Sequence, residues 1–274
     1  MLKIFLGPGG VPISAKDRST SGGLERVAEL GLNAMELEFV RKVYLNPITA
    51  KEIGKKAADL GIRLSIHAPY FINLCSEKKE VIAASKRMIF DSASIGEIVR
   101  ADAIAIHSAY YGKFNSEQAS KILEEHFQEV WDKMKENGIR KIELRIETMG
   151  RKSQFGGLDE VLEFCKEVKF VQPYIDWAHL FVRNYGSINY SEVFDKLEGF
   201  KIGHINSHFE GVKKDEKGNY VDIHTPINSH PPFEPLAKEI LKRKIDITII
   251  SESPLLEQDS LKMKGILEKL GHGF

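Results

Sequence analysis

Short runs of β-branched and aliphatic residues alternate with longer amphipathic segments along the whole chain. Eight of these runs predict strands, at Lys3–Leu6, Ala34–Phe39, Arg63–His67, Ala103–His107, Lys141–Glu147, Val171–Asp176, Lys201–Asn206 and Asp246–Glu252. The segments between them predict helices, at Glu25–Leu30, Ala50–Leu60, Val81–Val99, Glu117–Glu136, Leu158–Val168, Ser191–Leu197, Glu234–Arg243 and Leu255–Leu270. This alternation has no linker and predicts a single-domain (β/α)8 TIM barrel over residues 1–274. The alternative, a doubly wound open sheet, seldom needs so many units.

Composition limits the compartment and the partners that we expect. The chain contains 39 Lys and Arg and 39 Asp and Glu residues, so its net charge at pH 7 is zero. Proteins that hold nucleic acid through phosphate contacts alone usually have a basic excess, so such a role would have to come from local charge. The apolar runs are short, and two cysteines, Cys75 and Cys165, cannot form a disulfide framework. We therefore expect a soluble cytoplasmic protein with no membrane partner.

The alternation of side chains within each strand predicts which of them face the barrel interior. In Lys141–Glu147 the aliphatic residues occupy one face, and Glu143, Arg145 and Glu147 occupy the other. Because the apolar face of a barrel strand packs against the helices, the polar face points inward. The same alternation places polar side chains inward near the C-terminal ends of most other strands. Active sites of such barrels lie at that end.

Nine of the side chains expected at this end are imidazoles or carboxylates. They are His67, His107, Glu147, Asp176, His179, His204, Asp222, His224 and Glu252. A single residue of this kind is usually a satisfied polar group, but five of the nine histidines of the chain occur in this set. These are ligands that zinc, manganese and iron accept. Nine donors exceed the needs of one ion, so the set predicts two or three ions that share a bridging carboxylate.

One ligand position has an alternative close by in the sequence. His208 lies four residues after His204 and could take its role. The side-chain alternation and the His-x-Asn context favour His204, which is therefore the predicted ligand.

Several segments that contain these residues resemble the endonuclease IV family of apurinic/apyrimidinic endonucleases, a family of the wider xylose-isomerase-like barrels. The resemblance covers most of the chain and is carried by Ile66–Leu74, Ile106–Ser108, Glu147–Gly150, Ile175–His179, His204–Asn206, Val221–His224 and Ser251–Pro254. It implies a trinuclear zinc site, for which manganese or iron could substitute. The implied ligands are His67, His107 and a bridging, catalytic Glu147 for one ion, Asp176, His204 and Glu252 for the second, and His179, Asp222 and His224 for the third.

The resemblance also implies an activity and a partner. A metal-bound hydroxide would hydrolyse the phosphodiester on the 5′ side of an abasic site in double-stranded DNA, and the enzyme would be a monomer. The expected DNA-binding residues, from loops that follow the strands, are Arg41, Lys42, Tyr70, Lys113, Arg151, Lys152 and Arg183. The segments 40–47, 68–76, 108–115, 148–156 and 180–187 contain no Asp or Glu, so the neutral total hides a locally basic rim. Lys213, Lys214 and Lys217 are mixed with acids and predict only a solvated hairpin or lid.

Two other functions remain compatible with the pattern. A sugar isomerase or epimerase on the same barrel would need only Glu147, Asp176, His204 and Glu252 to hold one divalent ion, and the inward Glu36 and Glu38 fit such an enzyme. It would not need His67, His107, Asp222 and His224 together, so these four residues favour the nuclease. A binding protein that has lost catalysis would have a broken ligand set, and the sequence contains a complete one.

Overall fold

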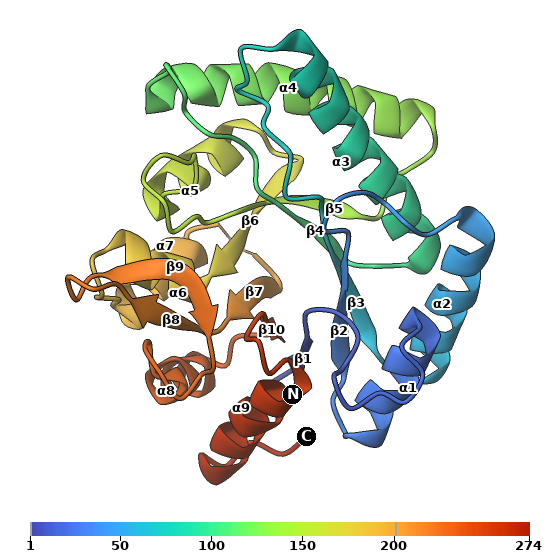
Figure 1. Cartoon of the computed structure of the whole chain (residues 1–274), viewed down its shortest axis with the longest axis vertical. Helices are drawn as coiled ribbons and strands as arrows, with labels where there is room; N and C mark the ends of the chain where they lie inside the picture. The colour runs from blue at the N-terminus through green and yellow to red at the C-terminus, as the bar shows by residue number, and fades with distance from the viewer. Residues whose placement is uncertain (1, 201) are drawn as a thin grey trace.

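The strands form a nearly closed ring in the computed structural model, which describes residues 2–200 and 202–274 (Figure 1). The eight barrel strands are β1 (Ile4–Pro8), β2 (Ala34–Glu38), β3 (Arg63–His67), β4 (Ala103–Ile106), β5 (Glu143–Glu147), β6 (Val171–Asp176), β7 (Ile205–Phe209) and β10 (Ile247–Ser251). They pair in parallel in the order β1-β10-β7-β6-β5-β4-β3-β2. The predicted (β/α)8 barrel is confirmed.

Helices surround the ring of strands (Figure 1). They are α1 (Thr20–Glu29), α2 (Pro47–Asp59), α3 (Lys79–Val99), α4 (Ser116–Glu136), α5 (Leu158–Glu167), α6 (Trp177–Arg183), α7 (Tyr190–Glu198), α8 (Phe233–Arg243) and α9 (Glu257–Lys269). Their buried faces, with Leu24, Phe127 and Leu236 fully excluded from solvent, pack on the outward aliphatic side chains of the strands. The short α6 was not predicted. Within the described residues, no helix is long and apolar enough to cross a membrane.

The first and second strands close the barrel through a side chain as well as through the backbone. The amide of Leu6 donates to Oδ1 of Asn33 over 2.7 Å, and Nδ2 of Asn33 donates to the carbonyl of Ile4 over 3.2 Å. At Gly7 a Cβ atom would lie 1.7 Å from the carbonyl oxygen of Ala34, so only glycine allows this approach. Beyond it, Gly10 N donates to the carbonyl of Glu36 over 3.0 Å.

The seventh strand begins four residues later than predicted. Lys201, at the start of the predicted Lys201–Asn206, lies outside the described residues, and β7 begins at Ile205. Pairing with both neighbours fixes this register, because Ile205 is opposite Ile247 of β10 and His208 is opposite Asp176 of β6. The chain then continues into an antiparallel hairpin of β8 (Gly211–Lys214) and β9 (Tyr220–Thr225), on which Lys213 and Lys214 are exposed, as predicted for this basic and acidic run.

Candidate metal centre

Glu147, the last residue of β5, lies at the centre of the polar cluster inside the barrel. Its Oε2 atom lies 3.2 Å from Nε2 of His67 and 3.1 Å from Nε2 of His107. Its Oε1 atom lies 3.3 Å from Nδ1 of His179 and 3.2 Å from Nδ1 of His208. One buried carboxylate therefore faces two pairs of imidazoles, as a carboxylate that bridges two cations would.

His67 and its neighbours have the hydrogen bonds that leave a ring nitrogen free for a metal. Nδ1 of His67 donates to the carbonyl of Ala68 over 2.7 Å, which leaves the Nε2 lone pair directed at Glu147. The residues His67, His107 and Glu147 offer ligand atoms within 4.8 Å of one another. They form the first of three histidine-containing groups in the described residues that could hold an ion.

The second group consists of Glu147, Asp176, His208 and Glu252, whose ligand atoms also lie within 4.8 Å of one another. Asp176 begins α6, and its Oδ1 caps that helix by accepting from the amide of His179 over 2.7 Å. The Asp-x-x-His motif therefore has a local structural cause. The other oxygen, Oδ2, is buried and has no hydrogen-bond partner among the described residues, which leaves it free to bind a cation.

The third group lies where α6 meets the β8–β9 hairpin and includes His179, His224 and Glu210. Asp222 lies beside them, with Oδ1 at 3.1 Å from Nε2 of His179 and 3.8 Å from Nε2 of His224. The Nδ1 atom of His224 is 3.2 Å from the carbonyl of Glu252, so Nε2 is the nitrogen that faces the carboxylates. Glu210 was not among the predicted ligands.

His204 does not belong to the cluster, and its prediction as a ligand is wrong. It precedes β7, and its Nε2 atom lies 2.7 Å from Oγ1 of Thr248 while its ring packs against Phe5. Burial, together with the nearby guanidinium groups of Arg63 and Arg145, lowers the pKa of His204 to about 3. His208 takes the predicted role because the strand starts later than its apolar pattern suggests.

Two acids of β2 also reach the cluster. Oε1 of Glu36 lies 2.7 Å from Nε2 of His208, and its Oε2 accepts hydrogen bonds from Ser65 Oγ over 2.6 Å and Tyr174 OH over 2.9 Å. Glu36 thus fixes the ring of His208 with Nδ1 directed at the second group. Glu38, Glu36 and Glu252 form a further set of ligand atoms within 4.8 Å. The alternation along β2 predicts that both acids point inward, but it does not show how close to His208 they lie.

The cluster has too little positive charge for its carboxylates, which fits the binding of divalent cations. Four carboxylate oxygens that are shielded from solvent form no hydrogen bond within residues 2–200 and 202–274, namely Glu38 Oε1, Asp176 Oδ2, which lies 3.2 Å from Nδ1 of His179, and both oxygens of Glu210. Burial raises the pKa of Glu38 to about 8 and that of Asp176 to about 6. Burial also raises the pKa of Glu147. The imidazoles of His107 and His208 lower this pKa by more, so it lies well below the usual range of a glutamate. Uncompensated buried carboxylates are costly, and a bound cation would remove that cost.

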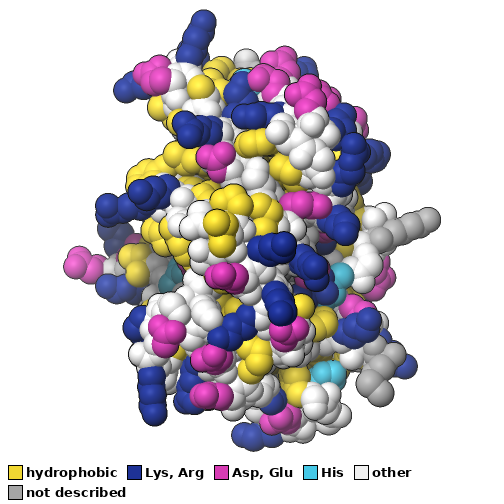
Figure 2. Space-filling view, turned by 90° about the vertical axis from the view of Figure 1, so that its right-hand side faces the viewer, with side chains coloured by type: hydrophobic (Ala, Val, Ile, Leu, Met, Phe, Trp, Pro, Cys, Tyr) yellow, Lys and Arg dark blue, Asp and Glu magenta, His cyan; other side chains and the backbone are white. Residues whose placement is uncertain are grey.

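The predicted DNA-binding residues of the rim differ in whether their charged groups already contact other side chains. Arg41 and Lys42 are exposed, whereas Lys113 pairs with Glu77 over 2.6 Å. Arg151 lies 3.4 Å from Asp222, and the Lys152 ammonium lies over the ring of the exposed Tyr185, 3.8 Å from its centroid. On the side of the molecule that Figure 2 shows, Lys and Arg side chains are interspersed with Asp and Glu side chains.

Tyr70 covers the mouth of the cluster. Its ring centroid lies 4.4 Å from that of His67 and 5.3 Å from that of His107, and its hydroxyl donates to Oε2 of Glu38 over 3.2 Å. The side chain is still partly exposed. Tyr70 is therefore the predicted rim residue that lies nearest to the first metal group.

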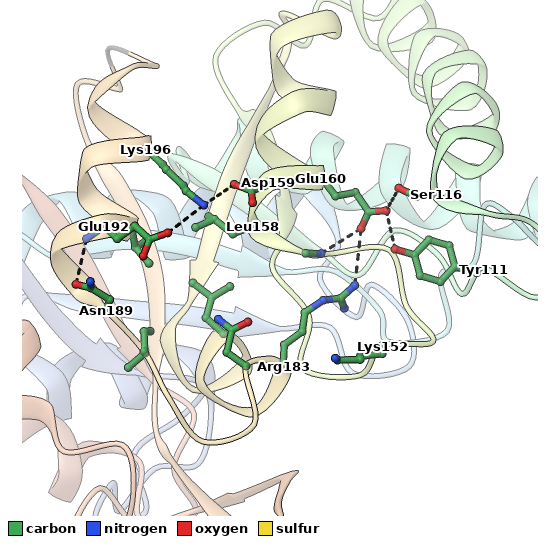
Figure 3. Close-up of a pocket in the computed structure, with 15 residues that line it drawn as sticks. Tyr111, Ser116, Lys152, Leu158, Asp159, Glu160, Arg183, Asn189, Glu192 and Lys196 are labelled. Atoms are coloured by element: carbon green, nitrogen blue, oxygen red, sulfur yellow. Dashed lines mark hydrogen bonds and ion pairs between the residues drawn. The ribbon is translucent and has the colours of Figure 1, made fainter.

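Arg183 supports a loop from the inside instead of facing solvent. Its guanidinium donates to the carbonyl oxygens of Met149, Arg151 and Gln154, at 3.2, 2.8 and 3.1 Å. It also lines a surface pocket of about 550 Å³ beside α5, α6 and α7, in which it points toward Glu160 (Figure 3). Glu160 is satisfied by the amides of Gly156 and Gly157, over 2.8 and 3.1 Å. None of the metal-ligand candidates lines this pocket.

Comparison with known proteins agrees with this architecture. The sequence profile described as "Xylose isomerase-like TIM barrel" matches residues 24–268. The chain belongs to this family. It is 31% identical over 269 residues to "Uncharacterized protein MJ0133" of Methanocaldococcus jannaschii, and the match covers 95% of each chain.

Solved structures that resemble this chain in fold are named for different activities. A D-tagatose 3-epimerase-like protein superposes with a TM-score of 0.74 and 21% identity, covering 98% of this chain and 96% of the other. Endonuclease IV from Thermus thermophilus also superposes with a TM-score of 0.74, at 18% identity, covering 98% of this chain and all of the other. At these identities the similarity supports a shared fold. It does not identify the reaction, which has to be inferred from the residues of the site.

Proposed function

We propose that this family member is a metal-dependent phosphodiesterase of DNA repair that hydrolyses the phosphodiester on the 5′ side of an abasic site. The observation that carries the proposal is the set of three adjacent ligand groups, two of which share Glu147. A single-ion enzyme of this fold has no need for His67, His107, Asp222 and His224 in addition to the second group. Many phosphatases and nucleases use two neighbouring divalent ions that stabilise the attacking and the leaving oxygen of the reacting phosphate.

The proposal assigns metal-binding and DNA-binding roles to the following residues of the chain. His67, His107 and Glu147 would hold one ion, Glu147, Asp176, His208 and Glu252 the second, and His179, Asp222 and His224 the third. Bound zinc or a similar divalent cation would activate water and neutralise charge on the phosphodiester. Tyr70 would meet the nucleotides beside the lesion, and the exposed Arg41, Lys42 and Lys152 would bind backbone phosphates.

The decisive assay uses a duplex oligonucleotide with one tetrahydrofuran abasic analogue. We expect the metal-loaded protein to incise it on the 5′ side of the analogue and to leave the intact duplex uncut. Glu147→Gln and Asp222→Ala should each abolish incision, whereas Glu234→Gln, a matched change on the exposed face of α8, should not. Incision at the wild-type rate by the first two variants would show that the proposed centre is not the active site.

A sugar epimerase is the second candidate, and the acids of β2 favour it. Glu147, Asp176, His208 and Glu252 suffice for one ion, and Glu36 and Glu38 place two more carboxylates beside that position. Several structures of this fold are named as epimerases, including the D-tagatose 3-epimerase-like protein. One ion per chain, no incision and epimerisation of a ketose at C3, followed by NMR of the sugar, would establish this function in place of the nuclease.

A further inference from the structure

Glu210 is the most isolated charged side chain in the cluster. It follows β7 directly and precedes the β8–β9 hairpin, and its side chain is fully excluded from solvent. Both carboxylate oxygens lack a hydrogen-bond partner among the residues that the structure describes. No Lys or Arg of those residues lies within ion-pair distance of it, and the nearest basic atom is Nε2 of His224, 3.9 Å from Oε1.

The backbone holds Glu210 in this place. A Cβ atom at the next residue, Gly211, would lie 2.0 Å from Oγ of Ser229 and 2.3 Å from the carbonyl of Pro226. Gly211 also pairs with Thr225, the residue after His224. The hairpin therefore brings Glu210 and His224 to the same side of the cluster, so the isolation of Glu210 follows from a closely packed turn.

Charged and ionisable groups surround this carboxyl group, but none of those in the described residues forms a hydrogen bond with it. The groups that face it are the carboxylates of Asp176 and Glu252 and the imidazoles of His179, His208 and His224. Because a buried polar group without a hydrogen-bond partner costs free energy, a cation bound beside Glu210 would complete its surroundings.

We propose that Glu210 is a direct ligand of a divalent cation held by His179 and His224. The ligand atoms of these three residues lie within 4.8 Å of one another. Ligand atoms that share a tetrahedral zinc ion at about 2.0–2.2 Å lie about 3.4 Å apart, so inward shifts of less than about 1 Å at each residue would complete the site. Asp222, whose Oδ1 lies 3.1 Å from Nε2 of His179, is the fourth member.

The third position then differs from the one that the endonuclease IV resemblance implies, which has two imidazoles and one carboxylate. With Glu210 and Asp222 together, two carboxylates neutralise the charge of a divalent ion. Such an ion should be held more tightly and should attract an anionic group less strongly than a cationic site would. This inference rests on the metal centre of the proposed function but not on its substrate.

The test compares Glu210→Gln with wild type. Glu234→Gln is the matched control, and His224→Ala removes another proposed ligand of the same position. Metal-free proteins are titrated with Zn²⁺ and separately with Mn²⁺ by calorimetry, and bound metal is counted by elemental analysis after dialysis. We expect Glu210→Gln and His224→Ala to lose one equivalent or to bind it at least about tenfold more weakly, and Glu234→Gln to match wild type. An unchanged number of ions at unchanged affinity in Glu210→Gln would overturn the proposal.

Thermal unfolding gives a second readout that does not depend on activity. Without metal, Glu210→Gln should be at least as stable as wild type, because it removes an unpaired buried carboxylate. With metal it should gain less stability than wild type does. If glutamine does not fit and the variant fails to fold, Glu210→Asp keeps the charge, and it should bind the third ion more weakly than wild type; unchanged binding there would also overturn the proposal. Both readouts measure metal binding or stability and not incision of DNA. A failed nuclease assay would therefore not count against Glu210 as a metal ligand, and the two failures remain distinguishable.

Discussion

His208 and Asp176 are opposite each other on the adjacent strands β7 and β6, and both side chains enter the barrel at the level of Glu147. His204 lies four residues earlier, which corresponds to about 13 Å along an extended strand. The two histidines therefore share one face of the chain and occupy different ends of the barrel. Because of this difference in position along the barrel axis, His208 reaches the candidate metal ligands and His204 does not.

This relationship gives the first prediction. His208→Ala should lower the affinity of the second ion by at least about 10²-fold and abolish catalysis, because it removes an imidazole directed at Asp176, Glu147 and Glu252. His204→Ala should bind metal as wild type does. Bound metal per chain, measured after gel filtration in chelator-free buffer, checks both variants. Normal metal content in His208→Ala with a deficit in His204→Ala would restore the assignment made from the sequence.

The error at this position shows what side-chain alternation can and cannot determine. His204 and His208 have the same parity, and Ile205–Phe209 contains three polar residues, so the aliphatic pattern points to a strand that begins too early. Only pairing with β6 and β10 fixes the register. Eight of the nine predicted ligands do come together, because six of them lie at the ends of barrel strands or in α6 and the other two, Asp222 and His224, lie on β9. Glu210 was not predicted as a member of the cluster, and Glu36 was predicted only to point inward, because the position of a side chain along the barrel axis depends on strand pairing.

Glu36 should act as a positioning residue for His208. In Glu36→Gln the amide could present an N–H group to Nε2 of His208, which would favour the tautomer with its proton on Nδ1 and disable the nitrogen that faces the second group. Metal affinity should fall about 10–100-fold, as for other partners of metal-bound histidines. Calorimetric titration with Zn²⁺ measures this effect. Ser65→Ala, which removes a different hydrogen bond to Glu36, should change affinity less, and equal losses in both variants would argue for a general packing defect.

The low pKa of His204 predicts a pH dependence of stability. Burial and two guanidinium groups lower this pKa to about 3 in the folded chain, so between pH 3 and the ordinary value near 6.5 only the unfolded chain binds a proton there. The stability that the neutral ring contributes is therefore present above about pH 6.5 and is lost as the pH falls.

His204→Gln should remove this contribution. Urea unfolding of the metal-free proteins between pH 4 and 7 should give a shallower pH dependence for the variant. The difference should stay below about 1.4 kcal/mol per pH unit, the limit for one proton, because the ring is only partly buried. Identical slopes for variant and wild type would contradict the low pKa of this histidine. A proton NMR titration of the wild type should also show the His204 imidazole, assigned by its absence in His204→Gln, as neutral throughout pH 5 to 8.

The closure of the barrel predicts opposite effects for the same substitution at two glycines. Gly7→Ala places a methyl group 1.7 Å from the carbonyl oxygen of Ala34, so β1 and β2 must separate. We expect a loss of about 3 kcal/mol or more in the free energy of unfolding. Gly265→Ala adds a methyl group inside α9 with nothing within 4 Å, and it should raise stability by about 0.5–1 kcal/mol. Chemical denaturation measures both values. An unchanged free energy of unfolding in Gly7→Ala would mean that β1 and β2 do not approach each other as closely as described.

The salt dependence of DNA binding should distinguish residues that contact DNA from residues that only support the structure of a loop. Lys42 is exposed and is expected to bind a phosphate, whereas Arg183 donates hydrogen bonds to three carbonyl groups of the loop after β5. Lys42→Ala should weaken binding to the abasic duplex and reduce the slope of log affinity against log salt by about 1, with little change in stability. Arg183→Ala should leave that slope unchanged and lower stability by about 1–3 kcal/mol, because the carbonyl groups lose a charged donor. Fluorescence anisotropy in the Glu147→Gln background, which prevents incision, measures the slopes. Binding that does not change with salt in any of these proteins would contradict phosphate contacts at the rim and favour a neutral sugar as the substrate.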